Sequence, residues 1–272
     1  QPADSFAKRW LSVLFFEVFN NRTPNAYDYF PEAMRIALQM APWLNGGLFS
    51  RNDLDDKFAG KFTVTDKRFE QTINFLEQYN FTVSEDTPLD QEVAVDAEML
   101  GKVYESLVNV SEETNEKGDA GIFYTPRTEI DMMCRLAVVD YLANHLDAGH
   151  KPLLYKTVFA FTPEEKTEAD EQLSNHNLWG ELDRLLQGIT VVDPACGSGS
   201  FLIGMLQVLD DLVQRSDTVL GRLESPYERR KRIIGQSLYG VDVMRWAVDV
   251  AELRLWLQLA IETELLPGEL KL

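Results

Sequence analysis

The feature that most constrains the fold of this chain is the segment VVDPACGSGSFL, residues 191–202. An apolar run ends in an acidic residue, a turn with two glycines follows, and an apolar helical pattern begins at once. This order predicts a short buried strand, a tight turn and a helix that starts where the turn ends. We expect Gly197 and Gly199 to let the backbone approach a ligand where any Cβ would clash.

The segments that follow extend this pattern. Ser225-Pro226 opens a predicted helix, SLYGVD at 237–242 reads as a second strand, and residues 243–262 read as a second long helix. Strand, helix, strand and helix at this spacing predict the opening of an α/β sheet with parallel strands.

The part before this unit has a different pattern. We predict an α-helical domain over 1–110 and a linker at 111–121, which is polar, acidic and punctuated by glycine. The α/β domain is predicted over 122–272. The expected helices of the first domain are an amphipathic one at the N-terminus, one after Pro31, one capped by Asp66 and one capped by Asp96. The turn APWLNGGLF, 41–49, is expected to be anchored by its large apolar residues.

Helix boundaries can also be predicted between the linker and residue 191. Thr128 is expected to cap a helix that runs to about His145, and Thr162-Pro163 to open another. Gly188 is expected to end the helix that carries LWGELDRLLQ.

Three classes of ligand use a strand, a glycine turn and a helix start. A Walker-type phosphate site requires lysine after the second glycine, where Ser200 lies, and a dinucleotide site requires a small residue where Leu202 lies. The third class is S-adenosylmethionine, whose positive sulfonium suits the acidic Asp193, whereas a pyrophosphate would be repelled. The alternative is a strand-turn-helix without a ligand.

Asp242 ends the second predicted strand, at the edge of the same crevice. A carboxylate at this place can accept hydrogen bonds from a ribose diol, and a solvated cap is the alternative. Because we expect its side chain to face the crevice, its loss should change stability little. In GIFYTPRTEI, 121–130, the plain interpretation is an aromatic anchor, Phe123 and Tyr124, followed by a helix start.

Together, FYTP, DPACGSGSFL and YGVD, in this order, resemble the cofactor motifs of the amino-type (N6-adenine) DNA methyltransferases. Upstream, WLNGGLF, YNFTVSED and VDAEMLGKVYESLVN are similar to the helical connector of type IIG restriction-modification proteins and of BREX-type phage-defence methyltransferases. The resemblance covers residues 40–260. It implies the N-terminal part of a class I S-adenosylmethionine-dependent, Rossmann-like methyltransferase domain over 122–272, preceded by the connector.

The resemblance also implies residue roles. Phe123, Tyr124, Thr125 and Pro126 belong to the segment that would line the methionine end of the cofactor. Asp242 would bind the ribose and Val243 would lie against the adenine ring. The loop around the cofactor would comprise Asp193, Pro194, Ala195, Gly197 and Gly199, with Phe201 packed beneath it.

In the family, the target adenine is flipped into a pocket lined by Asn-Pro-Pro-Tyr or Asn-Pro-Pro-Phe. Neither Pro-Pro nor Asn-Pro occurs in these 272 residues. We therefore assign no catalytic residue and expect the chain to be an inactive fragment of a site-specific DNA adenine-N6 methyltransferase from a restriction-modification or phage-defence system. Nuclease and target-recognition domains would flank it. The alternatives are a non-catalytic scaffold with a vestigial cofactor fold and a protein or RNA N-methyltransferase.

The net charge of −18 argues against broad contact with nucleic acid, so most DNA binding is expected outside this chain. The basic cluster at 229–232 is interpreted as a solvated helix face, with DNA contact as the alternative. Cys134 and Cys196 indicate no disulfide framework, and the three histidines lack metal-ligand spacing. We expect a cytoplasmic protein that binds no metal and does not cross a membrane.

Overall fold

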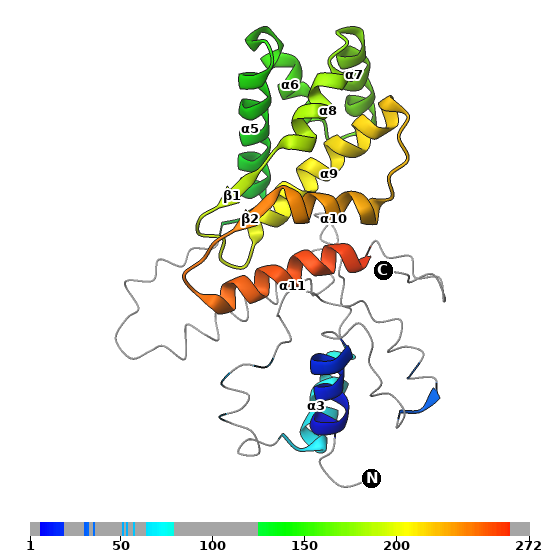
Figure 1. Cartoon of the computed structure of the whole chain (residues 1–272), viewed down its shortest axis with the longest axis vertical. Coiled ribbons are helices and arrows are strands. Elements are labelled where there is room, and N and C mark those ends of the chain that lie inside the picture. The colour runs from blue at the N-terminus through cyan, green and yellow to red at the C-terminus, as the bar shows by residue number, and fades with distance from the viewer. Residues whose placement is uncertain are drawn as a thin grey trace. The chain divides into compact units, whose positions relative to one another are not determined.

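A computed structural model describes residues 6–18, 64–78 and 125–261, together with 30–32, 35, 51, 53 and 57 (Figure 1). The chain divides into two compact units, one formed by 1–100 with 263–272 and the other by 101–262. Each unit is described by itself. The predicted linker at 111–121, the turn at 41–49, the helix capped by Asp96 and most of the helix after Pro31 lie outside the described residues.

The first unit contains the predicted N-terminal helix. Its hydrogen bonding is π-helical over η1 (Ala7–Leu11) and η2 (Leu14–Val18), and α3 spans Asp66–Leu76. The Phe6 ring lies 5.1 Å from that of Phe69, and the backbone N–H of Phe6 donates to the Asp66 carboxylate at 2.8 Å. The predicted capping role of Asp66 is therefore wrong: Thr65 occupies the N-cap, and Asp66 joins the N-terminal segment to α3.

The second unit is mostly helical. Its elements in chain order are α5 (Arg127–His145), η4 (Ala148–His150), α6 (Lys151–Val158), α7 (Pro163–Asn175), α8 (Trp179–Gly188), β1 (Val191–Asp193), α9 (Ser200–Leu220), α10 (Pro226–Gln236), β2 (Leu238–Gly240) and α11 (Arg245–Ile261).

Local capping signals place some of these boundaries. Thr162 forms a reciprocal capping box with Glu165, and the Ser225 hydroxyl accepts the Glu228 N–H, as both sequences predict. The end of α8 at Gly188 is also confirmed. The predicted cap at Thr128 is wrong, because α5 begins two residues earlier with Pro126 at its N-cap.

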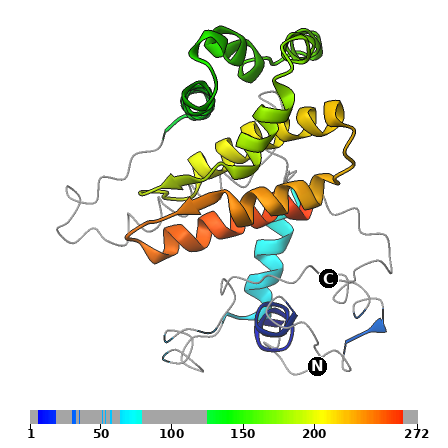
Figure 2. The same cartoon turned by 45° about the horizontal axis from the view of Figure 1, so that its top comes forward.

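The core is built around α9, which contacts α5, α8, α10 and α11. Apolar side chains along its length are buried, among them Leu206, Leu209 and Leu212, each at most 1% exposed. In both views α10 and α11 run side by side (Figure 1, Figure 2). The apolar helical pattern predicted to follow the glycine turn is thus confirmed, and the structure places this helix at the centre of the unit.

The two strands pair in parallel, with Val191 opposite Leu238 and Asp193 opposite Gly240. The described residues contain this pair and no further strand, so the parallel arrangement is confirmed and the larger sheet remains a prediction. The expectation that β1 is buried holds for one face only. Val192 and Tyr239, opposite each other in the register, are 62% and 50% exposed because no described element covers them.

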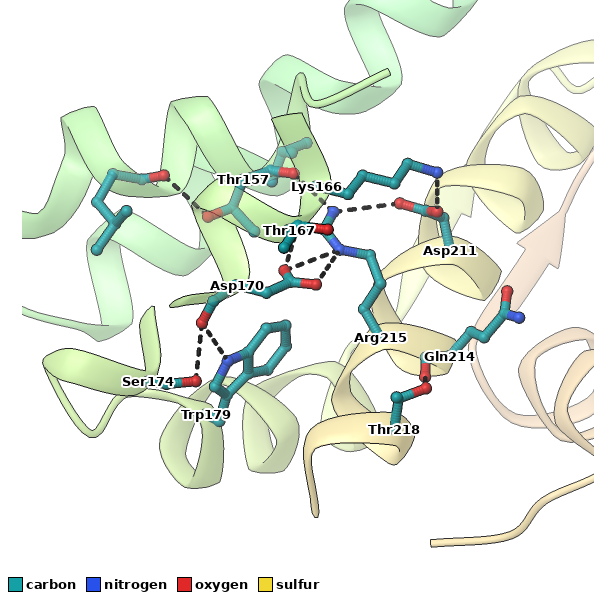
Figure 3. Close-up of polar contacts among 12 residues, drawn as sticks. Thr157, Lys166, Thr167, Asp170, Ser174, Trp179, Asp211, Gln214, Arg215 and Thr218 are labelled. Atoms are coloured by element: carbon teal, nitrogen blue, oxygen red, sulfur yellow. Dashed lines mark hydrogen bonds and ion pairs between the residues drawn. The ribbon is translucent and has the colours of Figure 1, made fainter. Parts of the chain in front are cut away.

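An ion network centred on the buried Arg215 joins α9 to α6 and α7 (Figure 3). The guanidinium of Arg215, on α9, pairs with Asp170 of α7 at 2.5 Å and donates to the Thr157 carbonyl of α6 at 2.8 Å. Asp211 accepts from Arg215 at 3.3 Å and from Lys166 at 2.5 Å. These charge-assisted bonds connect three helices and compensate the burial of the arginine.

Three of the four basic residues of α10 form ion pairs with carboxylates of this unit, whereas Lys231 is exposed and lies over the Tyr227 ring. Arg229 is 5% exposed and pairs with the buried Asp210 at 2.5 Å, and Arg230 pairs with the same carboxylate at 2.8 Å. Arg232 pairs with Glu224 at 2.8 Å. The prediction of a solvated face is therefore wrong for these three arginines, because Asp210 of α9 and Glu224, which precedes α10, pair with them. Among the described helices, none is long and apolar enough to cross a membrane.

Candidate functional site

The candidate site is the turn that links β1 to α9. Gly197 and Gly199 adopt left-handed φ angles of 52° and 82°, which glycine reaches without the strain that a Cβ brings. Asp193 begins the turn: its Oδ1 accepts the Ala195 N–H at 3.1 Å. Its Oδ2 is buried and has no hydrogen-bond partner among the described residues. A buried carboxylate oxygen of this kind is expected to have a hydrogen-bond partner outside the described residues.

Asp242 follows β2 and contacts this turn directly. One carboxylate oxygen accepts the Gly197 N–H at 2.9 Å, and the other accepts the Met244 N–H at 2.8 Å. Two backbone hydrogen bonds also join Val241, the residue before Asp242, to the turn. The Cys196 N–H donates to the Val241 carbonyl and the Val241 N–H donates to the Asp193 carbonyl, both at 2.9 Å. The structure therefore brings the two predicted acidic residues to one edge of the strand pair. Asp242 also holds the turn, a role that the sequence did not indicate.

The two glycines differ in what surrounds them. A Cβ at Gly197 would meet no atom within 4 Å, whereas a Cβ at Gly199 would lie 2.8 Å from the Cβ of Ala251. The expectation of close approach to a ligand therefore still applies to Gly197. At Gly199, glycine is required for another reason, because Ala251 of helix α11, which is 3% exposed, packs against the turn there.

The predicted segment FYTP is described only from Thr125 onward, and Phe123 and Tyr124 lie outside the described residues. Pro126 is the N-cap of α5, whose first turn packs against the first turns of α9. A Cβ at Gly204 would lie 2.7 Å from the Ile130 side chain, so the two helices approach closely there. The first turn of α5 and the first turns of α9 thus lie together.

The remaining predicted residues divide into buried and exposed ones. Phe201 is half-buried and packs against the core beneath the turn, and Cys134 lies 3.7 Å from its carbonyl. Pro194 and Ala195 are exposed, and Val243 is 97% exposed. Val243 therefore has its whole side chain available to a ligand.

Two nearby cysteines are poor nucleophiles. Burial raises the pKa of the Cys134 thiol to about 12 and that of Cys196 to about 11, and the charge of nearby aspartates adds to both increases. Both thiols are free and buried. They therefore stay protonated near neutral pH and pack as small apolar groups. Within the described ranges, no group of three His, Cys, Asp or Glu side chains could hold a metal ion.

Sequence reasoning missed two residues at this site. Gly240 of β2 lies so close to α9 that a Cβ would be 2.8 Å from Leu202 and 3.0 Å from Cys196. Arg254 of α11 is 3% exposed and donates to the Ser198 carbonyl at 2.8 Å. The signal for Arg254 was an arginine within the apolar run LRLWLQL, where a charge requires a buried partner.

Chemically, the site combines backbone N–H groups at a helix start, two carboxylates and open space beside Gly197. Helix N-termini favour anionic groups, and carboxylates favour cations and hydroxyl donors. The arrangement suits a ligand that carries both kinds of group.

Comparison with known proteins gives two matches. Residues 167–265 match the family model of the MmeI DNA-methyltransferase domain. The chain is also 34% identical over 255 residues to a protein of Methanocaldococcus jannaschii that is described as a type II restriction enzyme and methyltransferase. This alignment covers 92% of the chain and 21% of the relative, so the chain spans about a fifth of the relative's length. No solved structure matches the chain significantly.

Proposed function

The chain is a relative of restriction-modification methyltransferases, and from this relationship we propose that its whole protein methylates adenine N6 in DNA with S-adenosylmethionine. The residues described above form the edge of the cofactor site. The observation that carries the proposal is the meeting of Asp193 and Asp242 at one glycine turn, with a buried Asp193 oxygen that has no partner among the described residues.

The residues present fit this cofactor. The Asp193 carboxylate suits the positive charge of the sulfonium and ammonium groups, and the N–H groups in the first turn of α9 suit the carboxylate of the methionine part. Asp242 accepts one backbone hydrogen bond at each oxygen, and each oxygen has capacity for a second, which a ribose hydroxyl can use. The open space beside Gly197 gives the ligand room at the backbone. When bound, S-adenosylmethionine supplies an activated methyl group for direct displacement.

The assignment of the larger fold belongs to the same proposal. Parallel sheets are covered on both faces, and the described strand pair has one exposed face at Val192 and Tyr239. We place the pair in a class I, Rossmann-like sheet with further strands. The adenine pocket and most DNA contacts then lie in parts of the protein other than these residues, in agreement with the net charge of −18.

The proposal is tested with the full-length protein that contains this sequence. It is incubated with methyl-labelled S-adenosylmethionine and unmethylated duplex DNA, and the digested nucleosides are analysed by mass spectrometry. The expected product is N6-methyladenine, formed by the wild type and strongly reduced in Asp242→Ala. Label in protein or RNA with none in DNA would contradict the DNA substrate. Cofactor binding without transfer to any acceptor would support a scaffold role in place of the proposed one.

A further inference from the structure

Arg254 is a buried arginine that none of the proposed chemistry uses. It lies on α11, is 3% exposed, and its Nη1 donates to the Ser198 carbonyl at 2.8 Å. The same nitrogen lies 3.1 Å from the Ser200 hydroxyl oxygen and 3.4 Å from that of Ser198. A charged side chain removed from water has a large desolvation cost unless such acceptors compensate it. All three acceptors belong to the glycine turn and the first residue of α9.

These contacts fix one peptide unit of the turn at both of its ends. The carbonyl of Ser198 is held by Arg254, and the N–H of the same peptide, which belongs to Gly199, donates to the Cys196 carbonyl at 2.8 Å. The peptide that ends at the Gly197 N–H is held by Asp242. Only the Gly197–Ser198 peptide lies between these two, so its orientation is determined by the neighbours on either side.

A second contact of α11 also restrains the turn. Ala251, three residues before Arg254 and therefore on the same helix face, packs against Gly199. The turn is thus held by an anion from the end of β2 and by a cation from α11. The open space beside Gly197 adjoins the peptide that these groups orient.

We propose that Arg254 is a positioning residue that fixes the conformation of the Gly197–Ser200 turn and thereby sets the affinity of the site for its cofactor. The identity of that cofactor rests on the proposed function. The effect of Arg254 on the conformation of the turn is independent of the proposed function. Lysine at this position keeps the charge but lacks the planar guanidinium, so it cannot reproduce the arginine's geometry.

The experiment compares Arg254→Lys with Arg229→Lys. Arg229 is the matched control because it is equally buried and pairs with Asp210 of α9, away from the turn. For the wild type and both variants, amide hydrogen exchange is measured at Gly199 without ligand, and S-adenosylmethionine binding is measured by calorimetry. Melting curves show whether the two variants lose similar stability.

We expect Gly199 exchange at least ten times faster, and cofactor binding at least ten times weaker, in Arg254→Lys than in Arg229→Lys at similar melting temperature. Equal exchange and equal affinity in the two variants would overturn the inference. If no protein binds the cofactor but Gly199 exchange is accelerated only in Arg254→Lys, the positioning role is supported and the proposed function of this site is contradicted. If Arg254→Lys does not fold, Ser200→Ala decides. We expect severalfold faster Gly199 exchange in this variant, and unchanged exchange would overturn the inference.

Discussion

The carboxylate of Asp242 accepts the backbone N–H of Gly197 at 2.9 Å, although 45 positions separate the two residues in the chain. This bond joins the end of β2 to the glycine turn after β1. The sequence led us to expect a carboxylate that faces a crevice and matters little for stability. The structure shows two backbone hydrogen bonds to this carboxylate, so we expect the side chain that is proposed to bind ribose to stabilise the turn as well.

Asp242→Ala is expected to lower both cofactor affinity and stability. Hydrogen bonds to a charged group contribute about 1.5–3 kcal/mol each, so we expect affinity to fall at least about tenfold and the free energy of unfolding to fall by about 1–3 kcal/mol. Calorimetric titration with S-adenosylmethionine and ligand-free melting measure the two effects. Asp140→Ala, which removes an exposed ion pair with Lys151, is the control and should change neither. An unchanged affinity in Asp242→Ala would remove the ribose assignment.

The two glycines of the turn should respond differently to alanine. Gly199→Ala combines a left-handed φ with a Cβ that would lie 2.8 Å from Ala251, so we expect a loss of about 2–4 kcal/mol in unfolding free energy. Gly197→Ala has the unfavourable φ but open space, so about 1–2 kcal/mol is expected. If the space beside Gly197 holds the cofactor, Gly197→Ala will bind the cofactor more weakly than Gly199→Ala, although it is the less destabilised of the two. Full affinity in Gly197→Ala would place the ligand elsewhere.

Arg215→Met should strongly destabilise the second unit. The substitution leaves Asp170 and Asp211 without the guanidinium that pairs with both, and breaking a buried pair costs about 3–5 kcal/mol. Arg184→Met, which removes an exposed pair with Glu181, should cost less than about 1 kcal/mol. Urea unfolding of the three proteins gives these differences. Equal losses in the two variants would show that the network contributes no more than a surface ion pair.

The stability of the fold should decrease in alkaline solution partly through Cys134. Its pKa is raised from 9.0 to about 12, so the folded state holds the thiol proton that the unfolded state releases above pH 9. The contribution is complete below pH 9 and is lost as the pH rises toward 12, at up to about 1.4 kcal/mol per pH unit. Cys134→Ser, whose hydroxyl does not titrate here, should show a shallower decrease. Parallel curves of unfolding free energy against pH would contradict this assignment.

The 272-residue chain by itself is expected to transfer no methyl group to DNA. The motif that holds the flipped adenine in the resembled family does not occur in it. The chain is incubated with labelled S-adenosylmethionine and adenine-rich duplex, and the full-length protein serves as the positive control. Label in DNA above background from the chain alone would show that its own residues suffice.

Features that depend on near neighbours were predictable. The Ser225 and Thr162 caps, the end of α8 and the strand, turn and helix of residues 191–202 follow from hydrogen bonds and periodicity within a few positions. The same signals failed where two starts competed, as at Thr128 in α5. The approach of the two acidic residues was also predictable, because parallel strands end at one edge of a sheet.

The sequence by itself therefore determined the starts of α7 and α10, the end of α8 and the strand, turn and helix of residues 191–202, and it singled out the segments of the proposed cofactor site. Only the tertiary structure decided what each side chain contacts. The sequence suggested that Arg229 is a surface residue, but the structure pairs it with the buried Asp210. The sequence suggested that Gly199 contacts a ligand, but the structure packs α11 against it. Such contacts join residues far apart in the chain, and their partners are set by how α9, α10 and α11 pack. Local periodicity carries no information about that packing.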